Sequence, residues 1–138
     1  MHKIILDTNV VVSALIQKSY PYRIIFELFL KDKINLCISS QLVAKYYTVL
    51  KRPRFAQYQE FTTKAGVVLA NIEMKATRYK PEVTLYIISD KDDNKFLELA
   101  DECAADFIIT GNTKDFSFSR YKETRIVTPK EYWENHKP

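Results

Sequence analysis

The sequence predicts an α/β fold of three layers, in which helices flank both faces of a central, mostly parallel sheet. Two observations predict it: short apolar runs typical of buried strands alternate with segments of helical periodicity, and polar residues follow the apolar runs directly. A chain of 138 residues is long enough for one buried core, and two glycines and five prolines leave little room for a linker. We therefore expect residues 1–138 to form a single domain.

The elements of the first half follow from their apolar periodicity and their boundary residues. Pro21 is a good residue for a first helical turn, Ser39 and Ser40 offer an N-cap, and Pro53 stops the helix before it. The expected elements are a strand at 3–6, helices at 8–17 and 21–31, a strand at 34–38 and a helix from 40 to about 51.

The second half continues the alternation. Gly66 is a weak point in a helical stretch, so that stretch is read as one long helix or two shorter ones. Asp90 or Asp92 caps the following helix, and Pro129 opens the last one, which runs through Trp133. The expected elements are helical structure at 58–75, an apolar run at 83–88 that is a candidate strand, a helix at 92–103, and strands at 106–110 and 125–128.

Polar side chains follow the strands where an α/β protein places its chemistry. Right-handed crossovers gather the carboxyl ends at residues 6, 38 and 109 on one edge of the sheet, which is where open α/β sheets bind ligands. Asp7 follows the first strand, and it is either an N-cap for the next helix or one member of an acid cluster. The turn Thr110-Gly111-Asn112 is either a plain loop or a second polar group at that edge.

Asp93 is the second acid that the pattern singles out. It lies three and four residues before Phe96 and Leu97, so it shares the apolar face of its helix, and an inward carboxylate needs a partner or a cation. The alternative is a first-turn acid that favours the helix dipole, which is the simpler interpretation for Asp90 and Asp92.

Clustered carboxylates favour a hard cation, Mg²⁺ or Mn²⁺, and such sites hydrolyse phosphodiesters. His2 and His136 lie at the two chain ends, which argues against a zinc site or a Ser-His-Asp triad. Cys37 and Cys103 are expected to be reduced packing residues. The net charge of +4 permits binding to nucleic acid, and the lack of a long apolar run or secretory pattern predicts a cytoplasmic protein without a membrane segment.

The chain resembles the PIN domain family, and within it the bacterial group assigned as toxin components of toxin–antitoxin systems. The resemblance spans nearly the whole length. It is carried by Ile5-Leu6-Asp7-Thr8-Asn9-Val10, Leu50-Lys51-Arg52-Pro53-Arg54-Phe55, the segment from Asp90 to Ala100, the segment from Ala105 to Gly111, and Arg125-Ile126-Val127-Thr128-Pro129-Lys130-Glu131-Tyr132.

The resemblance implies a PIN-like sheet flanked by helices and a ribonuclease that depends on Mg²⁺ or Mn²⁺ held by four acids. Asp7 matches the first acid and Asp93 the third. The second, usually a glutamate, is Lys45 here, and the fourth, usually an aspartate, is Asn112. Two of the four acidic positions are therefore replaced.

Lys45 borders the apolar stripe of its helix, so it either extends to solvent or reaches Asp7 and Asp93 as a built-in counter-ion. An ammonium about 4 Å from a carboxylate is attracted by roughly 4 kcal/mol at an effective dielectric constant near 20, and it would repel a divalent cation by about twice as much. We therefore expect weak or absent metal binding and impaired hydrolysis. Asp115 or Asp90 could serve as substitute ligands, and Asn112 could offer its amide oxygen.

Three functions remain open: an active metal-dependent endoribonuclease, a domain that binds RNA or a protein without cutting, and a mainly structural role. RNA, an antitoxin protein and a second copy of the chain in a homodimer are the expected partners. The alternative for each basic side chain is a solvated surface. The candidate phosphate contacts are Lys45, Arg52, Arg54, Lys91, Lys95 and Lys114.

Overall fold

A six-stranded sheet forms the centre of the molecule, in the strand order β3-β2-β1-β4-β6-β5. The computed structural model describes residues 1–116 and 118–138, apart from the side chain of Asp115. All neighbouring strands are parallel except β5 and β6, which are antiparallel. The strands are β1 (Lys3–Leu6), β2 (Asn35–Ile38), β3 (Thr77–Arg78), β4 (Phe107–Ile109), β5 (Arg120–Tyr121) and β6 (Thr124–Val127).

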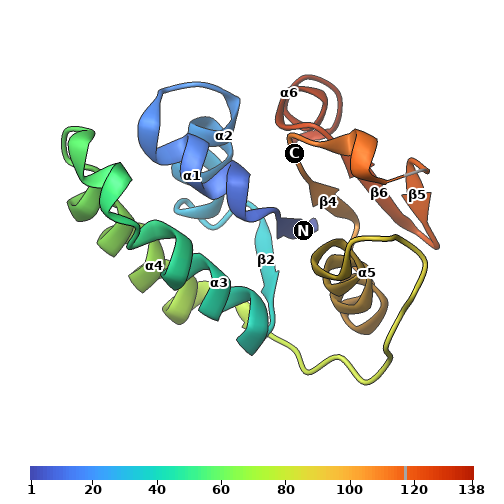
Figure 1. Cartoon of the computed structure of the whole chain (residues 1–138). Helices are drawn as coiled ribbons and strands as arrows, with labels where there is room; N and C mark the ends of the chain where they lie inside the picture. Colours follow the sequence, from blue (N-terminus) through green and yellow to red (C-terminus); the bar gives the residue numbers. More distant parts are fainter. Residues whose placement is uncertain (117) are drawn as a thin grey trace.

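Helices follow β1, β2, β3 and β6 along the chain, and the predicted α/β fold with flanking helices is confirmed (Figure 1). Two expected helices contain π-helical turns, at Ile24–Phe29 and at Tyr132–His136. The α-helices are α1 (Thr8–Ile16), α2 (Tyr20–Arg23), α3 (Ser40–Leu50), α4 (Phe61–Lys75), α5 (Lys91–Cys103) and α6 (Pro129–Glu131), and short 3₁₀ turns occur at η2 (Pro53–Gln57) and η3 (Thr113–Asp115).

The core lies between the sheet and these helices. Ile4, Ile5 and Leu6 of β1 are at most 1% exposed, as expected for a central strand covered on both faces. Figure 1 shows α3 and α4 side by side at one end of the molecule and α5 beside the middle of the sheet. Gly66 does not interrupt α4, which continues as a single helix. Within the described residues, each helix is too short or too polar to cross a lipid bilayer.

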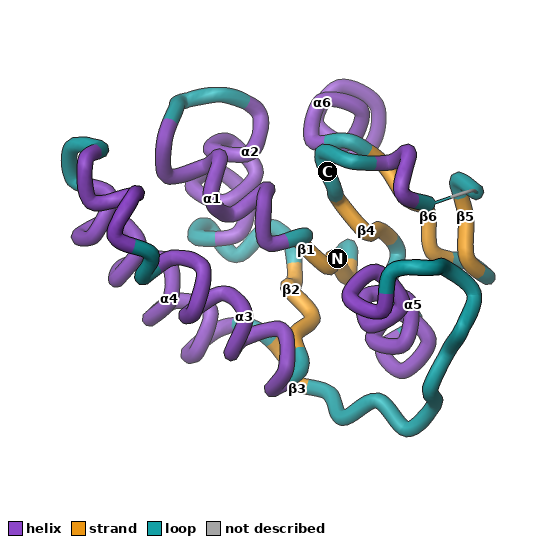
Figure 2. The backbone as a smooth tube through the Cα atoms, viewed as in Figure 1, coloured by secondary structure: helices purple, strands orange, loops and turns teal. Residues whose placement is uncertain are grey.

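The segment at 83–88 is not a strand, which corrects the extended structure considered for it (Figure 2). Its backbone is bound by side chains of α5 instead of by a neighbouring strand. The backbone N–H groups of Ile87 and Ile88 donate to Asn94 Oδ1 at 3.1 and 2.9 Å, and that of Leu85 donates to Glu98 Oε2 at 2.9 Å. The apolar and β-branched residues of this segment suggested a strand. Tertiary contacts decide whether such a segment forms one, and here the contacts with α5 prevail.

Candidate active site

The carboxyl edge of the sheet carries a polar residue directly after each of four parallel strands. Asp7 follows β1, Ser39 follows β2, Thr110 follows β4 and Thr128 follows β6. Asp7, Ser39 and Thr128 act as N-caps of α1, α3 and α6. The expectation that residues 6, 38 and 109 end at one edge is confirmed, because β1 pairs in parallel with both β2 and β4.

Asp7 is held at the middle of this edge by the neighbouring strand. Thr110 donates from Oγ1 to Asp7 Oδ2 at 2.7 Å, and the backbone N–H of Asn112 donates to the same Oγ1 at 3.1 Å. Asp7 also caps α1, accepting from the Asn9 backbone N–H at 3.5 Å. With 9% of its surface exposed, the Asp7 carboxylate is both a helix cap and a nearly buried anion.

Tyr46 binds the end of β1 directly before this carboxylate, a role that the sequence did not reveal. Its hydroxyl donates to the backbone carbonyl of Leu6 at 2.5 Å, and the side chain is 1% exposed. Burial, and to a lesser extent the charge of Asp7, raises the pKa of Tyr46 well above its ordinary range. The sequence showed Tyr46 only as a member of the apolar stripe of α3.

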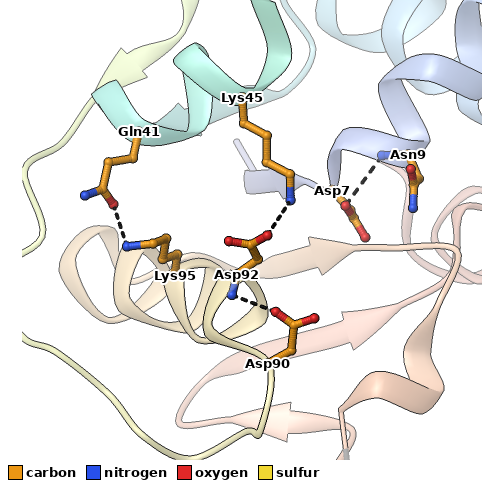
Figure 3. A network of polar contacts seen from close by, with 7 residues as sticks. All are labelled: Asp7, Asn9, Gln41, Lys45, Asp90, Asp92 and Lys95. Carbon is orange, nitrogen blue, oxygen red and sulfur yellow. Dashed lines mark hydrogen bonds and ion pairs between the residues drawn. The ribbon is translucent and has the colours of Figure 1, made fainter. Parts of the chain in front are cut away.

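Lys45 extends from α3 toward α5, and its ion pair is with Asp92. Its Nζ lies 3.7 Å from Asp92 Oδ2 (Figure 3). The same Nζ lies 5.6 Å from the centre of the Phe96 ring. The sequence had suggested Asp7 and Asp93 as its partners and had left Asp92 to the helix dipole. Lys45 thus lines the pocket that contains Asp7 and forms an ion pair with Asp92, and its expected contact with Asp7 and Asp93 stays a prediction.

The first turn of α5 separates the roles of its three acids. Asp90 is the N-cap and accepts from the Asp92 backbone N–H at 2.8 Å (Figure 3). Asp90 caps α5 as Asp7 caps α1, and its role as a substitute ligand stays a prediction. Asp93 is half-buried in the first turn, which agrees with a position beside the apolar face.

The loop after β4 carries the remaining predicted site residues. Asn112 is exposed and precedes η3, and its backbone N–H is tied to Thr110. Lys114 is exposed in η3. The side chain of Asp115 lies outside the described part of the structure, so its proposed role as a substitute metal ligand remains a prediction.

Two pockets meet at Lys45. The inner pocket, of about 270 Å³, contains Asp7, Thr8 and Asn9 together with the basic residues Lys45, Arg52 and Arg54. The outer pocket, of about 510 Å³, lies between α3 and α5. Of the six predicted phosphate contacts, four therefore lie around this groove, and Lys91 and Lys114 are exposed elsewhere at the start of α5 and in η3. The lining of the outer pocket is Ser39, Gln41, Leu42, Ala44, Lys45, Thr48, Val49, Arg52, Asp92, Lys95, Phe96 and Leu99.

The described side chains of the inner pocket offer few ligands to a divalent cation. Among the residues that the structure describes, no three His, Cys, Asp or Glu side chains come together in a group that could hold a metal ion. Both oxygens of Asp7 already accept hydrogen bonds, and three cations line its pocket. A hard cation favours several oxygen ligands with negative charge, which this arrangement does not supply.

Residues 3–114 match the model of the PIN domain family. The chain belongs to the PIN domain family. The match includes all four positions at which the family resemblance placed acids. PIN domains fall within a nuclease superfamily, and as a class they bind RNA and use Mg²⁺ or Mn²⁺. An uncharacterized protein of Methanocaldococcus jannaschii is 27% identical to this PIN-domain chain over 140 residues, covering 96% of the chain and 90% of that protein.

Proposed function

We propose that this PIN-domain protein is an RNA-directed endoribonuclease of the kind that serves as the toxin component of a toxin–antitoxin system, with a weakened metal site. The observation that carries the proposal is the position of Asp7. It lies at the middle of the carboxyl edge of the sheet, fixed by Thr110 of the neighbouring strand, and opens into a pocket lined by three cations. A fixed carboxylate in a basic groove suits a phosphodiester substrate.

The weakening follows from two positions. Lys45 brings an ammonium to the groove where the family resemblance places a glutamate, and Asn112 brings a neutral amide where it places an aspartate. Each replacement removes a negative charge from the neighbourhood of the metal, and Lys45 also adds a positive one. The expected affinity for Mg²⁺ or Mn²⁺ is therefore low.

A second candidate function is RNA binding without cleavage. The inner pocket favours it, because Asp7 is the one acidic residue beside Lys45, Arg52 and Arg54 in the described part of its lining, so the pocket attracts phosphate more than a metal ion. On this reading the protein would hold RNA, or be held by an antitoxin, without turning over a substrate.

A nuclease assay on single-stranded RNA with Mn²⁺, Mg²⁺ or EDTA tests the proposal. Weak wild-type cleavage in Mn²⁺ should disappear in Asp7→Asn, and the double variant Lys45→Glu with Asn112→Asp should raise it. Lys33→Glu is a matched control, because Lys33 is an exposed lysine outside both pockets.

The possible results separate the two candidates. RNA binding without cleavage, unchanged in the double variant, would favour the non-cleaving function. Strong wild-type cleavage that the double variant does not raise would show that these two positions do not weaken the site. A lack of both binding and cleavage would reject RNA as the substrate.

A further inference from the structure

The groove beside Asp7 consists of two adjacent pockets. They share three lining residues, Lys45, Val49 and Arg52. The inner pocket is polar and contains Asp7, whereas the outer pocket has an apolar floor that includes Phe96. A ligand with a charged group and an adjoining flat, apolar group would suit this pair of pockets.

The inner pocket has an excess of positive charge. Lys45, Arg52 and Arg54 line it, and Asp7 is its one acidic lining residue among the described side chains. Arg54 is partly positioned by the Phe55 ring, with the guanidinium carbon 4.9 Å from the ring centre. Three cations line the pocket with Asp7, and Asp92 lies 3.7 Å from Lys45, so about one positive charge remains to be balanced. An excess of positive charge suits the binding of a phosphate.

The inner pocket also contains a polar atom without a partner. Thr8 Oγ1 is buried and makes no hydrogen bond, and it is the only such side-chain atom among the described residues. Thr8 is 2% exposed and lines the pocket between Asp7 and Asn9. A buried hydroxyl without a partner is costly, and a bound phosphate oxygen would accept a hydrogen bond from it.

Lys45 is free to take a phosphate as its partner. Its ion pair with Asp92 is long, at 3.7 Å, and the two side chains are 37% and 65% exposed. Ion pairs this exposed contribute little to stability, so an exchange of Asp92 for a phosphate oxygen costs little. The pair therefore keeps Lys45 near the groove without fixing it there.

We propose that the inner pocket binds an RNA phosphate directly, through Lys45, Arg52, Arg54 and the hydroxyl of Thr8, and that it does so without a divalent cation. Lys45 takes the place of the metal ion as the positive charge beside the phosphate. The adjoining nucleoside lies in the outer pocket against Phe96. The inference rests on the proposed function in one respect, because both take RNA as the ligand.

Binding of a short, fluorescein-labelled single-stranded RNA in excess EDTA, measured by fluorescence anisotropy, tests this proposal. The wild-type protein should bind, and added Mn²⁺ should not tighten binding. Lys45→Met and Arg54→Met should each weaken binding by about tenfold or more, and Lys45→Glu should weaken it further. For Lys45→Met, the slope of log affinity against log salt should fall by about 0.7, as expected for one lost phosphate contact on a single strand.

Lys33→Met is the matched control, because it removes an exposed lysine that lines neither pocket, and it should bind like the wild type. Circular dichroism confirms that each variant is folded. Competition with inorganic phosphate, a nucleoside monophosphate and unlabelled RNA shows which source of phosphate the pocket prefers, and RNA should compete best.

The proposal is overturned if EDTA abolishes wild-type binding, or if Lys45→Glu binds RNA as tightly as the wild type. A preference for the free mononucleotide over RNA would also overturn it, in favour of a nucleotide site. Loss of Mn²⁺-dependent cleavage with intact binding in EDTA would contradict the ribonuclease function alone, so the two failures can be distinguished.

Discussion

Replacing Thr110 with valine tests how much the hydrogen bond between Thr110 and Asp7 contributes to the stability of the fold. The change keeps the shape of the side chain and removes the hydroxyl that donates to Asp7 Oδ2 at 2.7 Å. Thr110 is 1% exposed and Asp7 is 9% exposed, so water cannot readily replace the lost donor. Hydrogen bonds to charged groups contribute about 1.5 to 3 kcal/mol, and we expect Thr110→Val to lower the free energy of unfolding by about 2 to 3 kcal/mol.

Thr124→Val provides the comparison, because Thr124 is another buried threonine whose hydroxyl donates to a neutral acceptor, the backbone carbonyl of Ala105, at 2.5 Å. Its expected cost is about 1 kcal/mol. Thr63→Val, at an exposed position of α4, should change stability by less than about 0.5 kcal/mol. Urea denaturation at neutral pH measures all three free energies of unfolding.

A double-mutant cycle with Asp7→Asn isolates the pair. If the hydroxyl acts through the carboxylate, Thr110→Val should cost less in the Asp7→Asn background than in the wild type. Equal costs for Thr110→Val and Thr124→Val, together with additivity in the cycle, would refute the argument that Thr110 stabilises a buried charge.

Three further changes have defined outcomes. Tyr46→Phe should lower the free energy of unfolding by about 1 kcal/mol, because it removes the hydrogen bond to the Leu6 carbonyl. Burial raises the pKa of Tyr46, so above about pH 10 the unfolded chain loses this proton first and the folded state of the wild type loses stability. The variant should therefore show a smaller fall in the free energy of unfolding above about pH 10. Asp101→Asn should lower the free energy of unfolding at neutral pH, and the values for variant and wild type should converge in acid. The hydrogen bond from Lys122 lowers the pKa of Asp101, so the contribution of the carboxylate is lost as pH falls through that pKa. Unfolding measured over a series of acidic pH values tests this. Asn94→Ala should speed amide hydrogen exchange in the segment before α5, measured by mass spectrometry, and leave exchange in β1 unchanged.

The sequence predicted the strands that build the centre of the sheet. The segments at 3–6, 34–38, 106–110 and 125–128 are apolar enough to show their burial, and each forms a strand within one or two residues of the expected bounds. The two-residue strands β3 and β5 escaped detection because they are too short to show a period of two, and the sheet itself pairs them.

The part of the site that is positioned by the sheet could be predicted from the sequence. Asp7 could be placed because a polar residue that ends a buried strand lies at the carboxyl edge. The choice of Asp92 as the partner of Lys45 could not be predicted, because it depends on how α5 is rotated against α3. The unpaired hydroxyl of Thr8 was equally invisible, since hydrogen-bond satisfaction is a property of the packed structure.

The central position of β1 has a consequence for synthesis. The Asp7–Thr110 hydrogen bond joins residues that are 103 positions apart, and β1 pairs with β4 only when β4 has been made. Contacts between distant segments form late, and a nascent chain that ends before Thr110 lacks the hydroxyl that donates to Asp7. A ribosome-bound fragment therefore carries Asp7 without the strand that fixes it, so we expect any RNA-directed activity to arise only when nearly the whole chain has been translated.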